Sequence, residues 1–185
     1  MRHAATAGNI RKPYTIQGLR PDSELCPEGA AQARAVRLPP LAAAYCSPLA
    51  RARETARIVA GTAVEEPGLL EVDVGEWSGL TWAEIASRWP AEHAAFEADA
   101  ERHGYHGGEN LAQVRDRVLP CIERLAARHA GETVLAVSHG VVNRVLLSHW
   151  MGIPLRWARK LPQDNTGMNI IDWHDGAAKV RTVNA

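Results

Sequence analysis

Short apolar runs alternate along this chain with longer stretches in which apolar residues recur every three or four positions. Two runs have the length of buried strands, 41–46 and 133–137. Four stretches have helical periodicity: 28–36, 48–60, 110–129 and 141–150. Strands that alternate with helices in this way predict an α/β layer fold.

Local signals indicate where two of these helices begin and end. The Ser47 hydroxyl can cap the helix 48–60, with Pro48 in the first helical position, where a missing N–H costs nothing. Gly61 is suited to end that helix. Asn110 is the expected N-cap of the helix 110–129, which Pro120 is expected to bend.

The last part of the chain has the pattern of a β-hairpin. The segments 168–173 and 179–183 alternate as strands do, and an Asp175-Gly176 turn lies between them. No repeat, low-complexity segment or linker interrupts the 185 residues. We therefore expect a single domain over residues 1–185.

Composition excludes several classes of partner. The 21 basic and 21 acidic residues balance, so no broad basic field is available for nucleic acid. No apolar run approaches the length of a membrane span, and the start has no signal-peptide pattern, so we expect a cytoplasmic protein without a membrane partner. The oligomeric state is left open. Three widely separated cysteines are expected to be reduced packing residues: Cys26, Cys46 and Cys121.

Several residue types in the chain suit the transfer of a phosphoryl group. Arg2 and Arg51 offer permanently charged, planar guanidinium groups that match phosphate oxygens. A neutral imidazole, that of His3 or His139, could attack phosphorus directly and divide one displacement into two easier steps. Glu71 could protonate the leaving alkoxide and then deprotonate the attacking water, and a partly apolar setting would favour its protonated form.

The turn Ser138-His139-Gly140 joins the expected strand 133–137 to the helix 141–150. Free backbone N–H groups at such a turn, together with the positive end of the helix dipole, favour an anion. Gly140 is therefore a candidate to bind phosphate.

Five short motifs follow one another along the chain: Arg2-His3-Ala4-Ala5-Thr6 with Asn9, Ser47-Pro48-Leu49-Ala50-Arg51-Ala52 with Thr55-Ala56, Leu69-Leu70-Glu71 with Gly75, Trp77 and Gly79, Gly107-Gly108-Glu109-Asn110, and Ser138-His139-Gly140. In this order they resemble the motifs of the histidine phosphatase superfamily, the phosphoglycerate-mutase-like group, and within it the small phosphatases. The resemblance implies a three-layer αβα sandwich around a mostly parallel central sheet. It also implies a phosphomonoester hydrolase that needs no metal or other cofactor.

The resemblance assigns roles to individual residues. It implies that His3 carries the phosphoryl group and that Glu71 is the proton donor and then the general base. It further implies that Arg2, Arg51 and His139 hold the phosphate.

Two more residues are expected at the phosphate. Asn9 lies six positions after His3, as in many members of the family. Gln17 matches the family's loop glutamine after a two-residue insertion, for which Lys12 and Pro13 can account. Loop capping is the alternative role for both side chains.

The chain departs from the family's pattern at two places. Ala4 replaces the glycine after the histidine, so a positive φ there would be strained. Only Met1 precedes Arg2, although the family places this pair at the end of a central strand. We therefore expect a truncated first strand and a natural start upstream of Met1.

The segment at about 76–108 is expected to cover the substrate. Its aromatic residues should mostly pack within it: Trp77, Trp82, Trp89, Phe96 and Tyr105. His106 is a candidate to face the substrate. The substrate itself, expected to be a small phosphorylated metabolite, could be a sugar phosphate or a nucleotide-derived ester such as a ribazole phosphate, and a phosphoprotein is the other possibility.

Three other functions compete with this interpretation. A serine hydrolase would use Ser138 with Asp164 or Asp172 and with His174, since 136–140 resembles a nucleophile elbow. A phosphoglycerate mutase would share the chemistry and return the phosphoryl group to the substrate. An inactive relative would bind a phosphorylated ligand or a protein partner.

Overall fold

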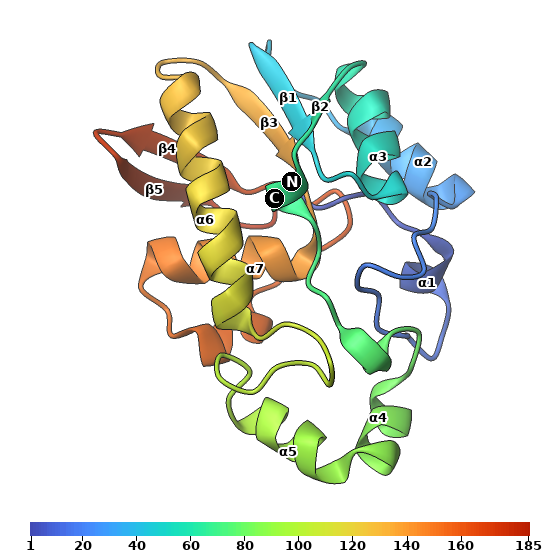
Figure 1. The fold of residues 1–185 in the computed structure, drawn as a ribbon. Coiled ribbons are helices and arrows are strands. Elements are labelled where there is room, and N and C mark those ends of the chain that lie inside the picture. The colour runs from blue at the N-terminus through green and yellow to red at the C-terminus, as the bar shows by residue number, and fades with distance from the viewer.

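The computed structural model describes all residues from 1 to 185 and contains a parallel three-stranded sheet in the order β2-β1-β3 (Figure 1). The strands are β1 (Ala43–Cys46), β2 (Val64–Glu65) and β3 (Val134–Val137). The helices are α1 (Ala7–Ile10), α2 (Pro27–Ala35), α3 (Ala50–Ala60), α4 (Trp82–Arg88), α5 (Pro90–Ala98), α6 (Leu111–Arg128) and α7 (Gly140–Met151), with 3-10 helices η1 (Pro67–Leu69), η2 (Gly75–Trp77) and η3 (Leu155–Lys160).

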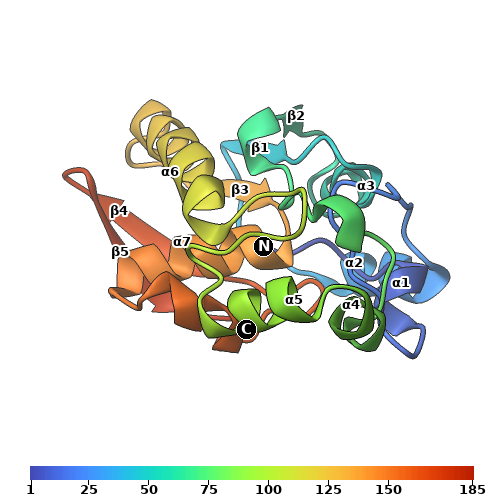
Figure 2. The ribbon, with the colours of Figure 1, turned by 60° about the horizontal axis from the view of Figure 1, so that its bottom comes forward.

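The sheet lies between two layers of helices, α2 and α3 on one side and α6 and α7 on the other (Figures 1 and 2). Alternation along β1 explains the two faces, because Ala44 and Cys46 pack in a cluster with α3 while Tyr45 belongs to the larger cluster on the other face. The predicted three-layer αβα sandwich with a parallel central sheet is therefore confirmed.

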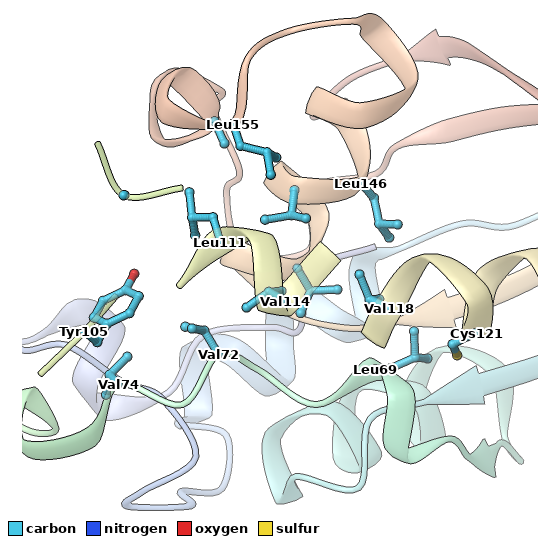
Figure 3. Close-up of a cluster of buried hydrophobic side chains, with 14 of the residues drawn as sticks. Leu69, Val72, Val74, Tyr105, Leu111, Val114, Val118, Cys121, Leu146 and Leu155 are labelled. Carbon is cyan, nitrogen blue, oxygen red and sulfur yellow. The ribbon is translucent and has the colours of Figure 1, made fainter. Parts of the chain in front are cut away.

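The larger core cluster holds the segment 69–74 in place. Leu111, Val114 and Val118 project from one side of α6 at spacings of three and four residues, and Leu69 and Val72 pack against them (Figure 3). These side chains are buried. Because Glu71 lies between two anchored residues, its backbone position is set by this core.

The structure corrects the expected start of α3. Ser47 and Pro48 precede the helix, which begins at Ala50 after Leu49. The Ser47 hydroxyl accepts a hydrogen bond from the N–H of Leu49 at 3.4 Å, whereas the N–H of Ala50 donates to the carboxylate of Asp22 at 2.9 Å. A carboxylate from a distant loop thus binds the first free N–H of the helix. Asn110 caps α6 as predicted, accepting from the N–H of Gln113 at 2.8 Å.

Residues 1–3 run beside the carboxyl end of β3. Arg2 forms a parallel bridge with Ser138, whose N–H donates to the carbonyl of Met1 at 2.9 Å and whose carbonyl accepts from the N–H of His3 at 2.9 Å. On the other side the N–H of Arg2 donates to the carbonyl of Gly167 at 3.1 Å. The pair Arg2-His3 is thus held by backbone hydrogen bonds on two sides.

The predicted hairpin at the end of the chain is confirmed. Strands β4 (Ile170–His174) and β5 (Ala177–Thr182) are antiparallel, and Asp175 and Gly176 both have positive φ in the turn between them. The three cysteines are buried and unbonded to one another, as expected. None of the helices has the length and apolar character needed to cross a membrane.

Candidate active site

A cavity of about 550 Å³ brings most of the predicted site residues together. The chemical groups that line it come from Arg2, His3, Gly8, Asn9, Tyr14, Thr15, Gln17, Arg51, Glu71, Gly140, Val141, Arg144, Asp164 and Asn165. Residues 2–3 lie beside the carboxyl end of β3, Arg51 is in the first turn of α3 after β1, and Gly140 begins α7 after β3. They therefore meet at the carboxyl end of the sheet, where open α/β folds bind ligands.

His3 is held in a defined tautomer. Its Nδ1 lies 2.8 Å from the carbonyl oxygen of Ala4, which can only accept, so Nδ1 carries the proton and Nε2 keeps its lone pair. Burial lowers the pKa of His3 well below its ordinary value, and the charges of Arg2 and Arg51 lower it further. The ring is therefore neutral at physiological pH, which is the state a nucleophile requires.

His139 is the N-cap residue of α7, and its ring lies next to the ring of His3. The centroids of the His3 and His139 rings are 5.2 Å apart, and neither ring nitrogen of the fully buried His139 has a hydrogen-bond partner. Burial lowers the pKa of His139, and His3 and Arg51 add to the effect. Buried polar atoms are rarely left unpaired, so these two ring nitrogens are available to hydrogen-bond a ligand in the site.

The two expected arginines bring further unpartnered donors to the cavity. Arg51 is 1% exposed, donates from Nη2 to the carbonyl of Gly18 at 2.8 Å and lies 3.6 Å from the Asp22 carboxylate. Its Nε and Nη1, and Nε of Arg2, are buried without a hydrogen-bond acceptor. Burial lowers the pKa of both side chains. Charged donors without acceptors around His3 form a site for an anion.

Glu71 faces the same cavity from the segment 69–74 and is 6% exposed. Its Oε1 accepts from the N–H of Val72 at 3.0 Å, and its Oε2 accepts from the N–H of Val141 at 3.4 Å. A carboxyl group and an unprotonated imidazole nitrogen therefore border one cavity, which is the arrangement that general acid–base chemistry at a phosphorylated histidine needs.

Asn9 and Gln17 also line the cavity and bind the side chain of Thr6. Asn9 Oδ1 accepts from the backbone N–H of Thr6 at 3.0 Å, and Gln17 Nε2 donates to Thr6 Oγ1 at 3.1 Å. Loop capping is thus part of what they do. Their contact with phosphate stays a prediction.

Ala4 adopts an ordinary backbone conformation, since the non-glycine residues with positive φ are Thr166, Asp175 and Asn184. Its N–H donates to Thr55 Oγ1 at 2.9 Å, and the Thr55 hydroxyl donates to the carbonyl of Arg51 at 2.7 Å. Alanine is therefore tolerated after His3. Thr55 links the loop that carries His3 to the helix that carries Arg51.

Sequence reasoning missed four polar residues in the cavity lining, Tyr14, Thr15, Arg144 and Asn165, and named Asp164 only as a possible partner of Ser138. Arg144 follows Gly140 by four residues, so one turn of α7 places the two on the same side of the helix. That periodicity could have revealed Arg144. Asp164, by contrast, lies in a loop for which the sequence contains no such signal.

Residues 76–108 do not line the cavity. They contact the loop 14–17, which does line the cavity. The N–H of Ile16 donates to the carbonyl of Leu80 at 2.8 Å, and the carbonyl of Ile16 accepts from the N–H of Gly79 at 2.9 Å. His106 lies 3.8 Å from Glu76, away from the cavity lining. The aromatic residues pack together as expected, with the buried Trp77 against the ring of Phe96 at 5.3 Å.

The serine-hydrolase alternative has no matching geometry. The buried hydroxyl of Ser138 donates to the carbonyl of Leu69 at 2.9 Å, so it is engaged with the backbone and not with a histidine. Asp172 and His174 lie on strand β4, outside the cavity lining, and only Asp164 of the three suggested partners borders the cavity.

Comparison with known proteins places the chain in one family. The family model described as "Histidine phosphatase superfamily (branch 1)" matches residues 1–185. A 2-carboxy-D-arabinitol-1-phosphatase of Triticum aestivum is 32% identical over 181 residues, which are 94% of this chain and 36% of that protein. Phosphoserine phosphatase 1 of Hydrogenobacter thermophilus is 30% identical over 179 residues, 92% of this chain and 83% of that protein.

Among solved structures, Bacillus stearothermophilus YhfR superposes with a TM-score of 0.85 at 32% identity, covering 97% of this chain and 92% of that one. The chain thus spans little more than a third of the Triticum protein, at 36%, and most of the other two, at 83% and 92%.

Proposed function

Because the chain belongs to the histidine phosphatase superfamily, we propose that it is a phosphomonoester hydrolase that acts on a small phosphorylated metabolite through a phosphohistidine at His3. The observation that carries this proposal is the hydrogen bond from Nδ1 of His3 to the carbonyl of Ala4, which leaves Nε2 unprotonated in a cavity lined by arginines.

In the first step Nε2 of His3 attacks phosphorus, the bond from phosphorus to the ester oxygen breaks, and Glu71 protonates the departing oxygen. In the second step Glu71 takes a proton from water, the water oxygen attacks phosphorus, and the P–N bond breaks. Inorganic phosphate leaves, and His3 regains its neutral ring.

The charge that develops on the equatorial oxygens is stabilised by donors that are already in place. The Nε atoms of Arg2 and Arg51 and the ring of His139, which have no hydrogen-bond partner, serve this role, together with Nη1 of Arg51, which forms only the 3.6 Å ion pair with Asp22. Because these donors are fixed and partly buried, they act without reorganisation at the moment of transfer. The proposed reaction therefore needs no metal ion.

We also propose that the segment 76–108 influences substrate choice. The hydrogen bonds from Ile16 to Gly79 and Leu80 support this role, since they tie the cavity-lining loop 14–17 to that segment. The segment would then act by positioning the loop over the bound ester.

Trapping the intermediate tests the mechanism. Rapid acid-free quenching during turnover of p-nitrophenyl phosphate, followed by peptide mass analysis under basic conditions, should locate one acid-labile phosphoryl group on the peptide that contains His3. The His3→Ala variant should carry no label and show no turnover, whereas His103→Ala, a change at an exposed histidine, should behave as the unmodified chain. Full activity of His3→Ala would refute the mechanism.

A further inference from the structure

Arg144 is a third guanidinium in the cavity, and the proposed phosphoryl chemistry does not use it. Its Nε donates to the carbonyl of Leu161 at 2.8 Å, and its two terminal nitrogens form no hydrogen bond and no ion pair within the protein. The hydrogen bond to Leu161 orients the planar group, so the terminal nitrogens are presented as a fixed fork.

The position of this fork relative to Arg2 is defined by Gly140. A Cβ atom on Gly140 would lie 3.4 Å from Nη1 of Arg144 and 3.6 Å from Nε of Arg2. The two guanidiniums therefore border the same space, which the absence of a side chain at 140 leaves open. A substrate whose phosphate is held by Arg2 has its neighbouring atoms within reach of Arg144.

A carboxylate borders the same cavity. Asp164 lines it and is exposed, and its Oδ2 accepts from Nδ2 of Asn184 at 2.9 Å, while Oδ1 has no donor. It forms no ion pair with Arg2 or Arg144, although its charge opposes the lowering of the pKa of both by burial. The cavity thus offers an unpaired carboxylate oxygen near an unpaired guanidinium fork.

We propose that the cavity binds an O-phosphorylated amino acid, with Arg144 taking the carboxylate and Asp164 the ammonium group. This inference rests on the proposed function for the phosphate end of the substrate. A guanidinium fork matches a carboxylate in two parallel hydrogen bonds, whereas Asp164 can only accept and so selects a donor.

The charges in the cavity agree with this substrate class. Three arginines (Arg2, Arg51 and Arg144) outnumber the two carboxylates in the cavity lining, Glu71 and Asp164, and the lowered pKa values of His3 and His139 keep both rings uncharged. The lining therefore suits a substrate with net negative charge. A phosphoamino acid has a net negative charge, and its one ammonium group matches the carboxylate of Asp164.

Four substrates that differ in these two groups test the assignment: O-phosphoserine has both, 3-phosphoglycerate has the carboxylate, O-phosphoethanolamine has the ammonium, and ethyl phosphate has neither. Arg144→Gln should lower kcat/KM about tenfold to a hundredfold for the first two, with little change for the others, as expected for a lost charge-assisted hydrogen bond. Asp164→Asn should lower it for O-phosphoserine and O-phosphoethanolamine. Arg156→Gln, a change at an exposed arginine, is the matched control.

Equal losses on all four substrates would overturn the assignment, because Arg144 would then act on the phosphate or on the fold. So would an unmodified chain that shows no preference for O-phosphoserine over ethyl phosphate. Calorimetric binding of O-phosphoserine to His3→Ala, with and without Arg144→Gln, reads the same contacts without turnover. If the proposed hydrolysis is absent, a weaker Kd in the double variant still supports the assignment, and an unchanged Kd rejects it.

Discussion

The rings of His3 and His139 face each other with their centroids 5.2 Å apart and their planes at 57°, in a site where burial keeps both imidazoles uncharged. Two neutral rings side by side do not repel each other, whereas two imidazolium ions would. The lowered pKa values of both rings therefore oppose protonation of the free pair, and a bound phosphate, as we propose, would bring negative charge beside them.

This pairing predicts a loss of stability in acid. The pKa of each histidine is lowered on folding, so below about pH 6.5 the unfolded chain binds protons that the folded chain does not. The free energy of unfolding should therefore fall as pH decreases from about 6.5 towards the lowered folded-state pKa values, by up to about 1.4 kcal/mol per pH unit for each histidine. Urea unfolding at a series of pH values measures this slope.

The variant His139→Gln should reduce the pH dependence of the free energy of unfolding by the contribution of one histidine, up to about 1.4 kcal/mol per pH unit. His149→Gln, at an exposed position on the same helix, is the control and should leave the slope as it is. An unchanged slope in His139→Gln would show that the buried ring does not drive the acid sensitivity.

The proposed acid role of Glu71 predicts a dependence on the leaving group. Glutamine keeps the size of the side chain but has no proton to give, so Glu71→Gln should lower kcat for an alkyl phosphate by about 10²- to 10⁴-fold. The loss should be smaller for p-nitrophenyl phosphate, because p-nitrophenolate leaves without protonation. Steady-state rates on both esters measure the difference, with Glu76→Gln as an exposed control. Equal losses on both esters would make Glu71 a structural residue.

The hydroxyl of Thr55 is predicted to support both stability and turnover. Thr55→Val keeps the shape of the side chain but leaves the buried N–H of Ala4 without an acceptor, which should lower the free energy of unfolding by about 1–3 kcal/mol. Turnover should also fall, because the loop that carries His3 loses its link to Arg51. Thr55→Ser restores the hydroxyl and should recover most of both properties. A Thr55→Val variant with unchanged stability and unchanged turnover would contradict the proposed link.

Removal of metal ions should leave the activity unchanged. Across residues 1–185 no three histidine, cysteine, aspartate or glutamate side chains are arranged to hold a metal ion, and arginines supply the positive charge in the proposed mechanism. The measurement is kcat/KM after exhaustive dialysis against a chelator, followed by addition of Mg²⁺, Mn²⁺ or Zn²⁺. Activity that disappears on dialysis and returns with one of these ions would refute the metal-independent mechanism.

Interactions between residues a few positions apart could be predicted from the sequence. Asn110 caps α6 by a hydrogen bond with a residue three positions further on, and Asp175-Gly176 forms a two-residue turn. In both cases the interacting residues are close in the sequence. The α/β alternation likewise follows from local periodicity. Ordered motifs were sufficient to indicate His3 and Glu71 as parts of one site, since they carried a resemblance to a family.

Tertiary structure decided what joins residues far apart in the sequence. The carboxylate of Asp22 binds the start of α3, where the local signal at Ser47 predicted a cap, because a charged acceptor from a distant loop reaches the first free N–H. Arg144 and Asp164 enter the cavity in the same way. The sequence by itself therefore determined the layer fold through short-range pattern, and through motif order it indicated the groups that we propose to react. Only the packed chain decided which donors stay unpartnered in the cavity, because that depends on distances that no local pattern records.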